Sequence, residues 1–445
     1  MLCALLCPEK STLTNLICTG GRQQQDWSAA YRLYSQERVD ERVLFSEVRD
    51  QVIACLPPQE PLVVAIDDTL VRKRGALIHG VSWRRDPLGP PFQTNLVRGQ
   101  RFIQFSAAWP LEEGRARMVP IGFFHAPSAA KAPKDADAGQ LQAHREQQKQ
   151  RSLNAQALCQ MGELRGQCDP SRPIVFNGDG SYTNATVLKG LPAQSTYIGR
   201  IRKDAKLHEL PGKSLASTGR RPSYGPLAPT PEELRIDEQT PWQQVDAFAA
   251  GKRHQFRIKT LGPVLWRKSG AALPLRVIVI APLGYRLRAG AKLLYRQPAF
   301  IICSDPQMSL EKVLQYYLWR WGIEVNFREE KSLIGAGQAQ VRTEASNTHL
   351  PAVIVAAYAL LWVSALRLRQ RGAEIPWLQP PKWRRRSPQE HPLPSTGDLL
   401  RTLRFEIWSA ALRPASFYDF VTASPTNTKL QKPAPSLPSM LFAAA

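Results

Sequence analysis

Apolar residues recur at steps of three and four positions in the first part of the chain, most clearly in the segment DWSAAYRLYSQERVDERVLFSEVRDQVIACL, residues 26–56. This period is typical of amphipathic helices. Pro57, Pro58 and Pro61 then interrupt the pattern. We therefore expect a small helical N-terminal domain over residues 1–58.

Short runs of β-branched and aromatic residues follow the prolines and predict buried strands. The runs are LVVAI at 62–66, FIQFSAAW at 102–109, MVPIGFF at 118–124 and PIVF at 173–176, and a long polar helical stretch precedes the last. Three strands, a helix and a further strand are the order of an RNase H-like α/β core. Acidic residues, Asp67-Asp68 and Asp179, stand at the ends of the first and last of these strands.

The pattern changes over residues 203–305, where Pro-rich loops separate the short runs HQFRIKT, GPVLWRK, LRVIVIA, KLLYRQ and AFIIC. These runs predict a β-rich insertion. A helix is expected at 309–331 and an apolar helix at 351–369.

The predicted fold class is thus α/β: an RNase H-like mixed-sheet core interrupted by a β-rich insertion, with a helical N-terminal domain. The first half of the core spans 59–202 and its C-terminal helices span 306–372. A Pro-rich basic tail, 373–445, completes the chain and includes Lys382-Trp383-Arg384-Arg385-Arg386.

Charge narrows the class of partner. The chain has 59 Lys and Arg residues against 37 acidic ones, a formal net charge of +22. Such an excess favours a polyanion, bound through phosphate contacts and counterion release. Nucleic acid is therefore the first candidate, ahead of an anionic membrane surface, and a basic protein without a specific partner is the plain alternative.

Cysteine usage and hydropathy indicate the compartment. Seven cysteines without paired spacing argue against a secreted disulfide framework. The only membrane-like stretch, residues 351–366, is shorter than the roughly 20 residues that a span needs. We therefore expect a cytoplasmic, nucleoid-associated protein with no membrane partner.

The sharpest chemical signal lies in the predicted helix 309–331. Tyr317, Arg320, Glu324 and Lys331 fall within a sector of about 60° at the helical period. One face therefore carries a phenol, two cations and a carboxylate, a set that suits a metal-holding acid flanked by phosphate contacts. The plain alternative is a solvated face of i, i+4 salt bridges. Apolar bulk on the same helix argues against that alternative, and it comes from Trp319, Trp321, Ile323 and Phe327.

The spacing Y-x2-R-x3-E-x6-K also resembles the signature of a group of bacterial insertion-sequence DDE transposases. The segment Asp67-Asp68-Thr69 with Lys73 and Gly75 resembles the D-[DE]-T-x3-K-x-G motif of this group at its first acid. Asp179-Gly180-Ser181-Tyr182 resembles its D-x2-Y motif at the second. The resemblance covers residues 60–370 in outline and is loose outside the motifs.

The resemblance implies a catalytic and metal-binding triad of Asp67, Asp179 and Glu324. Strand parity does not decide between Asp67 and Asp68 as the first acid, although the motif alignment favours Asp67. The plain alternative for each aspartate is a residue that turns or caps the chain at a strand end. The β-rich insertion would account for the long gap between Asp179 and Glu324 (324 − 179 = 145 positions). Tyr317, Arg320 and Lys331 would contact DNA.

Carboxylates fit the implied chemistry, because two-metal cleavage of a phosphodiester needs hard oxygen ligands. The expected cofactor is a pair of Mg²⁺ ions, with Mn²⁺ as a substitute. Trp266 is weighed as a base-stacking residue of the insertion and, more simply, as a tryptophan of the sheet core.

The expected function is that of a DNA transposase, an endonuclease and strand transferase that uses double-stranded DNA. It would bind terminal inverted repeats, with the domain 1–58 as the candidate for end recognition, and would join the 3′-hydroxyl strand to target DNA. A homodimer on DNA is expected. Two alternatives stay open: a catalytically inactive DNA-binding remnant, and another RNase H-like DNA nuclease.

Overall fold

The computed structural model describes residues 1–372 and 393–411 except for short gaps, and the gaps are 76, 87–88, 91, 94, 213–221, 271, 287 and 289. The chain divides into two compact units. One unit comprises Phe45–Phe327, and the other comprises Met1–Leu44 together with the segment from Arg328 onward. The predicted basic segment 382–386 lies outside the described residues.

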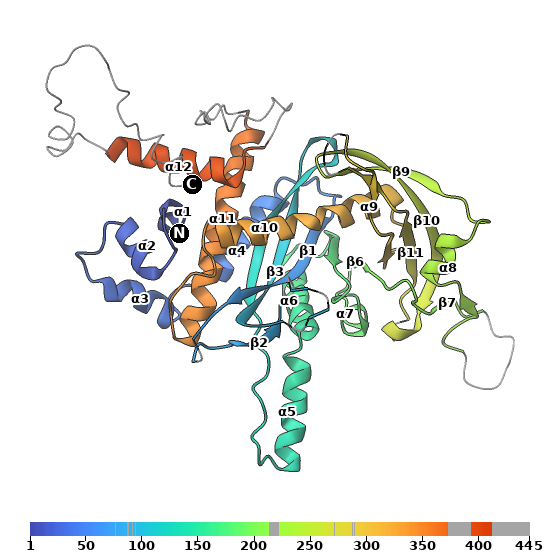
Figure 1. The fold of residues 1–445 in the computed structure, drawn as a ribbon, viewed down its shortest axis with the longest axis horizontal. Helices are drawn as coiled ribbons and strands as arrows, with labels where there is room; N and C mark the ends of the chain where they lie inside the picture. Colours follow the sequence, from blue (N-terminus) through green and yellow to red (C-terminus); the bar gives the residue numbers. More distant parts are fainter. Residues whose placement is uncertain are drawn as a thin grey trace. The chain divides into compact units, whose positions relative to one another are not determined.

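The larger unit is built on one mixed sheet, drawn in blue to yellow in Figure 1. Its strand order is β2-β3-β1-β5-β6-β14-β11-β10-β7-β8, with β4 paired to β3 and β9 paired to β10. The strands are β1 (Leu62–Arg72), β2 (Ser82–Arg85), β3 (Leu96–Pro110), β4 (Ala116–His125), β5 (Ile174–Gly178), β6 (Ser195–Arg200), β7 (Leu207–Glu209), β8 (Leu227–Ala228), β9 (Gln243–Ala249), β10 (Lys252–Trp266), β11 (Leu275–Ile280) and β14 (Ala299–Cys303). A separate pair is formed by β12 (Gly284–Tyr285) and β13 (Leu294–Tyr295).

The first five strands of this sheet confirm the predicted mixed α/β core. Strand β1 pairs antiparallel with β3 and parallel with β5, and β5 pairs parallel with β6. The last pair in the parallel register joins Ile66 to Gly178. Asp67 and Asp179 each follow their half of this pair, so neighbouring strands bring the two predicted acids to one edge of the core.

The segment between β6 and the C-terminal helices is rich in strands, and these strands continue the core sheet. Strand β14 pairs with β6, and β11, β10 and β7 follow outward. The runs HQFRIKT and GPVLWRK, predicted as two strands, form one long strand, β10, with an irregularity between Leu261 and Val264. The glycine and proline between the runs, Gly262 and Pro263, bend the strand without ending it.

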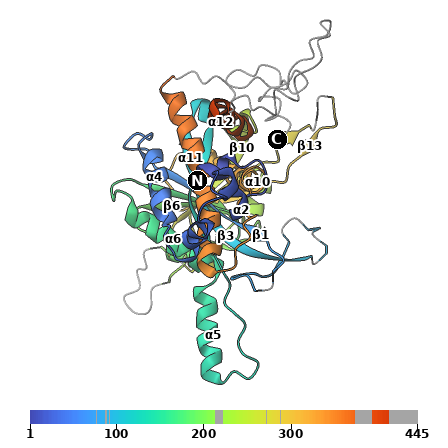
Figure 2. The ribbon, with the colours of Figure 1, turned by 90° about the vertical axis from the view of Figure 1, so that its left-hand side faces the viewer.

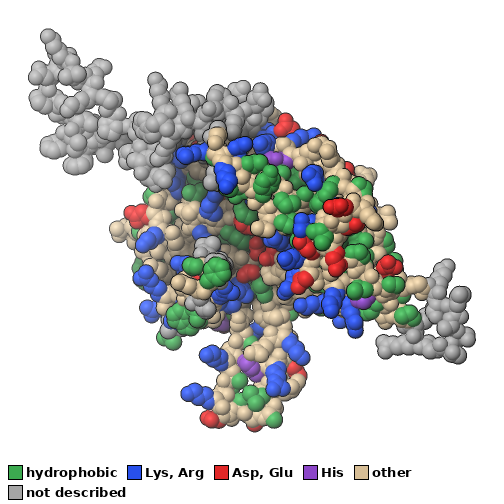
Figure 3. All heavy atoms as spheres, turned by 45° about the vertical axis from the view of Figure 1, so that its right-hand side comes forward, with side chains coloured by type: hydrophobic (Ala, Val, Ile, Leu, Met, Phe, Trp, Pro, Cys, Tyr) green, Lys and Arg blue, Asp and Glu red, His purple; other side chains and the backbone are tan. Residues whose placement is uncertain are grey.

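Helices complete this unit. They are α5 (Ala138–Gln150), α6 (Leu153–Gln167), α7 (Ala185–Lys189), α8 (Pro231–Ile236) and α9 (Leu310–Trp319), while α4 (Glu41–Ile53) and α10 (Trp321–Ser332) cross the boundary between the units. Helix α5 projects away from the sheet in Figures 1 and 2, and none of its residues is buried. The space-filling view in Figure 3 shows Lys and Arg side chains, in blue, on this projection.

One face of the sheet packs against α9 and the start of α10. Their buried residues Val313, Leu314 and Ile323 share a cluster with Val63 and Ala65 of β1. Because side chains alternate along a strand, Asp67 lies on the same face as Val63 and Ala65, and Asp68 lies on the opposite face.

The predicted single helix over 309–331 is two helices that meet at Arg320. The amide of Arg320 donates to the carbonyl of Tyr317, and the amide of Ile323 donates to the carbonyl of Arg320. These i to i+3 bonds tighten the backbone for one turn while Arg320 keeps helical angles. Across this break Arg320 still contacts both Tyr317 and Glu324, so these three residues of the predicted face stay together.

The smaller unit is helical: α1 (Leu2–Leu6), α2 (Leu13–Thr19), α3 (Trp27–Ser35), α11 (Glu344–Gln370) and α12 (Thr396–Ala411). Helix α11 packs against α1, α3 and α12. The Arg404 guanidinium of α12 donates to the carbonyls of Leu5 and Cys7, at 3.0 and 2.9 Å. This bond pattern ties the two ends of the described chain into one helical unit.

The apolar run 351–366 belongs to this longer helix α11, whose 27 residues are long and apolar enough to cross a membrane. Helix α11 is longer than the predicted helix 351–369. It begins seven residues before the apolar run and ends four residues after it. In its most apolar 18-residue window, 78% of the residues are buried. Burial to this extent is typical of a core helix.

Packing of α10 on the sheet makes a direct prediction. Ile323 is fully buried, whereas its neighbour Trp321 is 62% exposed. Ile323→Ala is expected to lower the free energy of unfolding by about 2–5 kcal/mol, because it leaves a cavity in the core. Trp321→Ala on the same helix is the control, with an expected loss below about 1 kcal/mol. Urea unfolding measures both, and equal losses would contradict the packing of α10.

Candidate functional site

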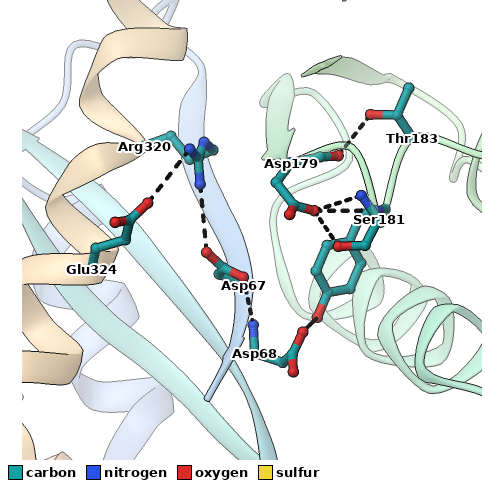
Figure 4. A network of polar contacts seen from close by, with 8 residues as sticks. Asp67, Asp68, Asp179, Ser181, Thr183, Arg320 and Glu324 are labelled. Carbon is teal, nitrogen blue, oxygen red and sulfur yellow. Dashed lines mark hydrogen bonds and ion pairs between the residues drawn. The ribbon is translucent and has the colours of Figure 1, made fainter. Parts of the chain in front are cut away.

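Asp67 and Glu324 meet through the guanidinium of Arg320. Arg320 Nη1 lies 3.5 Å from Asp67 Oδ2, and Nη2 lies 3.7 Å from Glu324 Oε1. Figure 4 shows the guanidinium between the two carboxylates, with Asp179 across from it on the segment after β5. The structure thus brings residues from the first predicted motif and the predicted helix, 253 positions apart for Arg320 and Asp67, into contact.

Burial separates this arrangement from a solvated helix face. The side chains of Arg320 and Asp67 are 14% and 18% exposed, whereas Glu324 is 38% exposed. Trp321, expected to contribute apolar bulk around Glu324, points instead to solvent. The shielding comes from the sheet beneath α10.

The electrostatics of Asp67 reflect crowding of like charges. Burial and then the nearby charge of Asp179 raise the pKa of Asp67 to about 7, and the Arg320 guanidinium opposes both effects. Burial also raises the pKa of Glu324, again against Arg320. A group of acids held this close gains from an added cation.

Asp179 is fixed by the turn that follows β5. Its Oδ1 accepts hydrogen bonds from the backbone amide and hydroxyl of Ser181, at 2.8 and 2.6 Å. The hydroxyl of Thr183 donates to the carbonyl of Asp179 at 2.8 Å. Asp179 thus stabilises a turn at the end of a strand, as the plain alternative predicted, and its charge also lies close enough to raise the pKa of Asp67. Its second oxygen, Oδ2, accepts none of these hydrogen bonds.

Asp68 has different partners from Asp67. Its Oδ2 lies 3.1 Å from Arg101 Nε, and its Oδ1 accepts a hydrogen bond of 3.2 Å from the hydroxyl of Tyr182. Tyr182 is only 1% exposed, and burial raises its pKa, so it stays a neutral donor. The geometry therefore places Asp67, and not Asp68, with Arg320 and Glu324.

Two residues at the site, Tyr182 and Arg101, had no role assigned from the sequence. Tyr182 is visible in the D-x2-Y motif, where its spacing from Asp179 carries the signal. Arg101 has no sequence signal, because it reaches Asp68 only through the pairing of β1 with β3.

The other predicted DNA contacts lie on the same helices. Arg320 stacks over Tyr317, with its guanidinium carbon 5.9 Å from the ring centroid. Lys331 lies exposed in the last turn of α10, seven residues after Glu324. Tyr317 and Arg320 are thus placed together with the acids, whereas Lys331 belongs to the other compact unit.

A groove of about 1050 Å³ borders Gly180, directly after Asp179. Five cations line it, Arg200, Arg202, Lys203, Arg235 and Lys268, together with the single acid Glu232. Arg235 and Arg202 are paired with Glu232 and Asp204. Trp266 borders the groove but is 7% exposed, which agrees with a tryptophan of the sheet core.

The donor chemistry of the three predicted acids fits a divalent metal ion. Asp67, Asp179 and Glu324 supply the hard oxygen donors that Mg²⁺ prefers. Among the described residues, no three His, Cys, Asp or Glu side chains stand close enough together to hold an ion without rearrangement. Arg320 is the cation that contacts two of the three acids in this arrangement.

Comparison with known proteins gives one family. The family model described as DDE superfamily endonuclease matches residues 2–272, more than half of the chain. The match covers Asp67 and Asp179 and ends before Glu324. No curated protein matches the chain.

Proposed function

The chain belongs to the DDE superfamily of endonucleases, and from this premise we propose that it is a DNA transposase. It binds the terminal inverted repeats of an insertion sequence, cleaves phosphodiester bonds at the element ends and transfers the 3′-hydroxyl strand to target DNA. The observation that carries the proposal is the contact of Asp67 and Glu324 with one buried arginine, beside Asp179.

Asp67, Asp179 and Glu324 are proposed as the metal ligands and catalytic acids. When bound, two Mg²⁺ ions would activate the attacking oxygen and stabilise the leaving oxygen. The crowding of acids around Asp67 supports this assignment, because a buried cluster of like charges without sufficient counter-charge is costly.

Arg320 is proposed to exchange partners when DNA binds. In this arrangement its guanidinium contacts both Asp67 and Glu324. A guanidinium can equally hold two oxygens of a phosphate, so the same side chain can turn from the acids to the scissile strand. Tyr317 supports it from the preceding turn, and Lys331 adds a point charge further along α10.

The groove beside Asp179 is proposed as a path for the DNA backbone. Arg200, Lys203 and Lys268 line the groove, and among the described residues none of the three forms an ion pair within 4 Å. Cations therefore outnumber the acids at this groove, although the charge of Lys203 also acts on Asp204 and Glu232. Cations of this kind bind phosphates through release of condensed counterions. We also propose that the helical segment 1–58 recognises the element ends and that the protein binds DNA as a homodimer.

The triad is tested by amide substitutions. Asp67→Asn, Asp179→Asn and Glu324→Gln should each slow Mg²⁺-dependent cleavage of the element's own ends at least about 100-fold, because an amide is isosteric but not anionic. Asp68→Asn is the matched control, and it should stay within about tenfold of the parent rate. Single-turnover cleavage assays measure this, together with DNA binding, which should persist in all four variants.

Near-parental cleavage by Glu324→Gln would refute the triad. A greater effect of Asp68→Asn than of Asp67→Asn would make Asp68 the first acid. Absence of cleavage by the parent chain, with DNA binding intact, would identify an inactive DNA-binding remnant.

Arg320 has its own test. Arg320→Ala is expected to slow cleavage by about 10- to 100-fold, since charge-assisted hydrogen bonds contribute about 1.5–3 kcal/mol. Arg320→Lys should recover only part of the rate, because an ammonium lacks the two-pronged geometry. Arg328→Ala, at an exposed position of α10, is the control. Unchanged cleavage with a stability loss below about 0.5 kcal/mol would show that Arg320 only forms an ion pair on the helix and does not contact the scissile strand.

The groove is tested by salt dependence. The double variant Lys203→Gln with Lys268→Gln should flatten the log-log slope of DNA affinity against salt by about 0.9 for each phosphate contact that it removes. Lys252→Gln with Arg253→Gln, exposed at the turn between β9 and β10, removes the same charge elsewhere. Equal slopes for the two double variants in a fluorescence-anisotropy titration would exclude the groove as a DNA path.

A further inference from the structure

A second basic pocket lies beside Asp68, outside the proposed catalytic arrangement. Its volume is about 250 Å³, and it is an open pocket between the strands β2 and β3 and the junction of α5 with α6. Arg84, Arg101 and Arg151 line it, and none of the residues that line it is acidic. Asp68 is ion-paired with Arg101 at 3.1 Å and its charge also acts on Arg84, so one carboxylate faces three arginines.

The arginines of this pocket carry unused hydrogen-bonding capacity. Arg84 Nη2 donates to the hydroxyl of Ser128 at 3.0 Å, but its buried Nε has no acceptor among the described residues. Burial and the neighbouring Arg101 guanidinium lower the pKa of Arg84 to about 10. Two cations held together in this way gain from an anion placed between them.

Neutral groups complete a lining of donors. The side chain of Gln148 borders the pocket, and so does the N-terminus of the 15-residue helix α6, through Ser152 and Leu153. The first amides of a helix and its dipole both favour an anion. They support the arginines here and would not by themselves define a site.

Size selects the kind of anion. At about 250 Å³ the pocket lies just below the range of sites for drug-sized ligands and has room for one phosphate group. Arginine guanidinium groups match phosphate oxygens in geometry as well as in charge. The ion pair of Arg101 with Asp68, the residue next to Asp67, connects the pocket to the catalytic arrangement.

We propose that this arginine pocket, formed by Arg84, Arg101 and Arg151, binds one backbone phosphate of the DNA held by the enzyme. That the phosphate belongs to DNA rests on the proposed function, whereas the binding of a phosphate by three arginines does not. A bound phosphate would fix the strand at a second point beyond the three acids and so set its register at the site.

The first arm of the test uses inorganic phosphate and the full chain. Phosphate should raise the melting temperature of the parent relative to chloride at equal ionic strength, because a ligand that binds the folded state stabilises it. Arg151→Gln, an exposed change, should weaken the apparent affinity about tenfold. Arg145→Gln, exposed on the same helix but outside the pocket, should bind phosphate like the parent. Equal responses of the two variants, or no response in the parent, would overturn the site.

The second arm uses DNA in which single phosphates are replaced by neutral methylphosphonates. At one position near the cleavage site, the substitution should weaken binding to the parent about tenfold and to Arg151→Gln hardly at all, since that variant no longer makes the contact. Arg145→Gln should respond like the parent at every position. Phosphate binding without any such position would overturn DNA as the source and leave a site for free phosphate.

The two arms separate this proposal from the proposed function. A chain that binds DNA with the predicted coupling but does not cleave it would contradict the transposase and keep the pocket. A chain that cleaves DNA, but in which no methylphosphonate position depends on Arg151, would support the transposase and contradict the pocket as a DNA contact.

Discussion

The parallel pairing of β1 with β5 is the constraint on which the candidate site depends. Its register ends at Ile66 and Gly178, and an aspartate follows on each strand. The two acids are therefore neighbours although more than a hundred residues separate them in the chain. A slip of one residue in this register would turn the side chains of one strand to the other face and separate them.

Arg320 then determines which acids belong together. A buried arginine is costly unless it is paired, and here it contacts both Asp67 and Glu324. The tightened turn between α9 and α10 places its side chain over the sheet, while Ile323 anchors the helix in the core. Helix packing and ion pairing thus support each other at the point where charge is most crowded.

The strand-rich segment keeps the third acid close despite the long gap in sequence. After β6 the chain passes to the outer strands β7 and β8 and returns inward through β10 and β11 to β14, which pairs directly with β6. Helix α9 begins a few residues later. The segment therefore enlarges the sheet from its edge without separating the strands that hold Asp67 and Asp179. It also supplies Lys268 to the groove beside Asp179.

The sequence by itself determined much of the core. The order of strands and helices, the acid after β5 and the common face of Tyr317, Arg320 and Glu324 all follow from local periodicity, which depends only on neighbouring residues. The predicted strand end at Asp67-Asp68 was wrong, because pairing with β3 continues β1 through both acids to Arg72. The break at Arg320 and the continuity of β10 were missed. Hydrogen bonding over one turn and pairing with a neighbouring strand decide these, and neither leaves a trace in the period of apolar residues.

Only the tertiary structure decided between Asp67 and Asp68 as the partner of Arg320. Adjacent residues of a strand point to opposite faces, but a sequence does not say which face a distant helix will cover. Helices α9 and α10 pack on the face that carries Val63 and Ala65, and Asp67 on this face therefore contacts Arg320. On the opposite face Asp68 contacts Arg101 and Tyr182. Arg101 comes from the paired strand β3, and Tyr182 comes from the turn after β5, far along the chain.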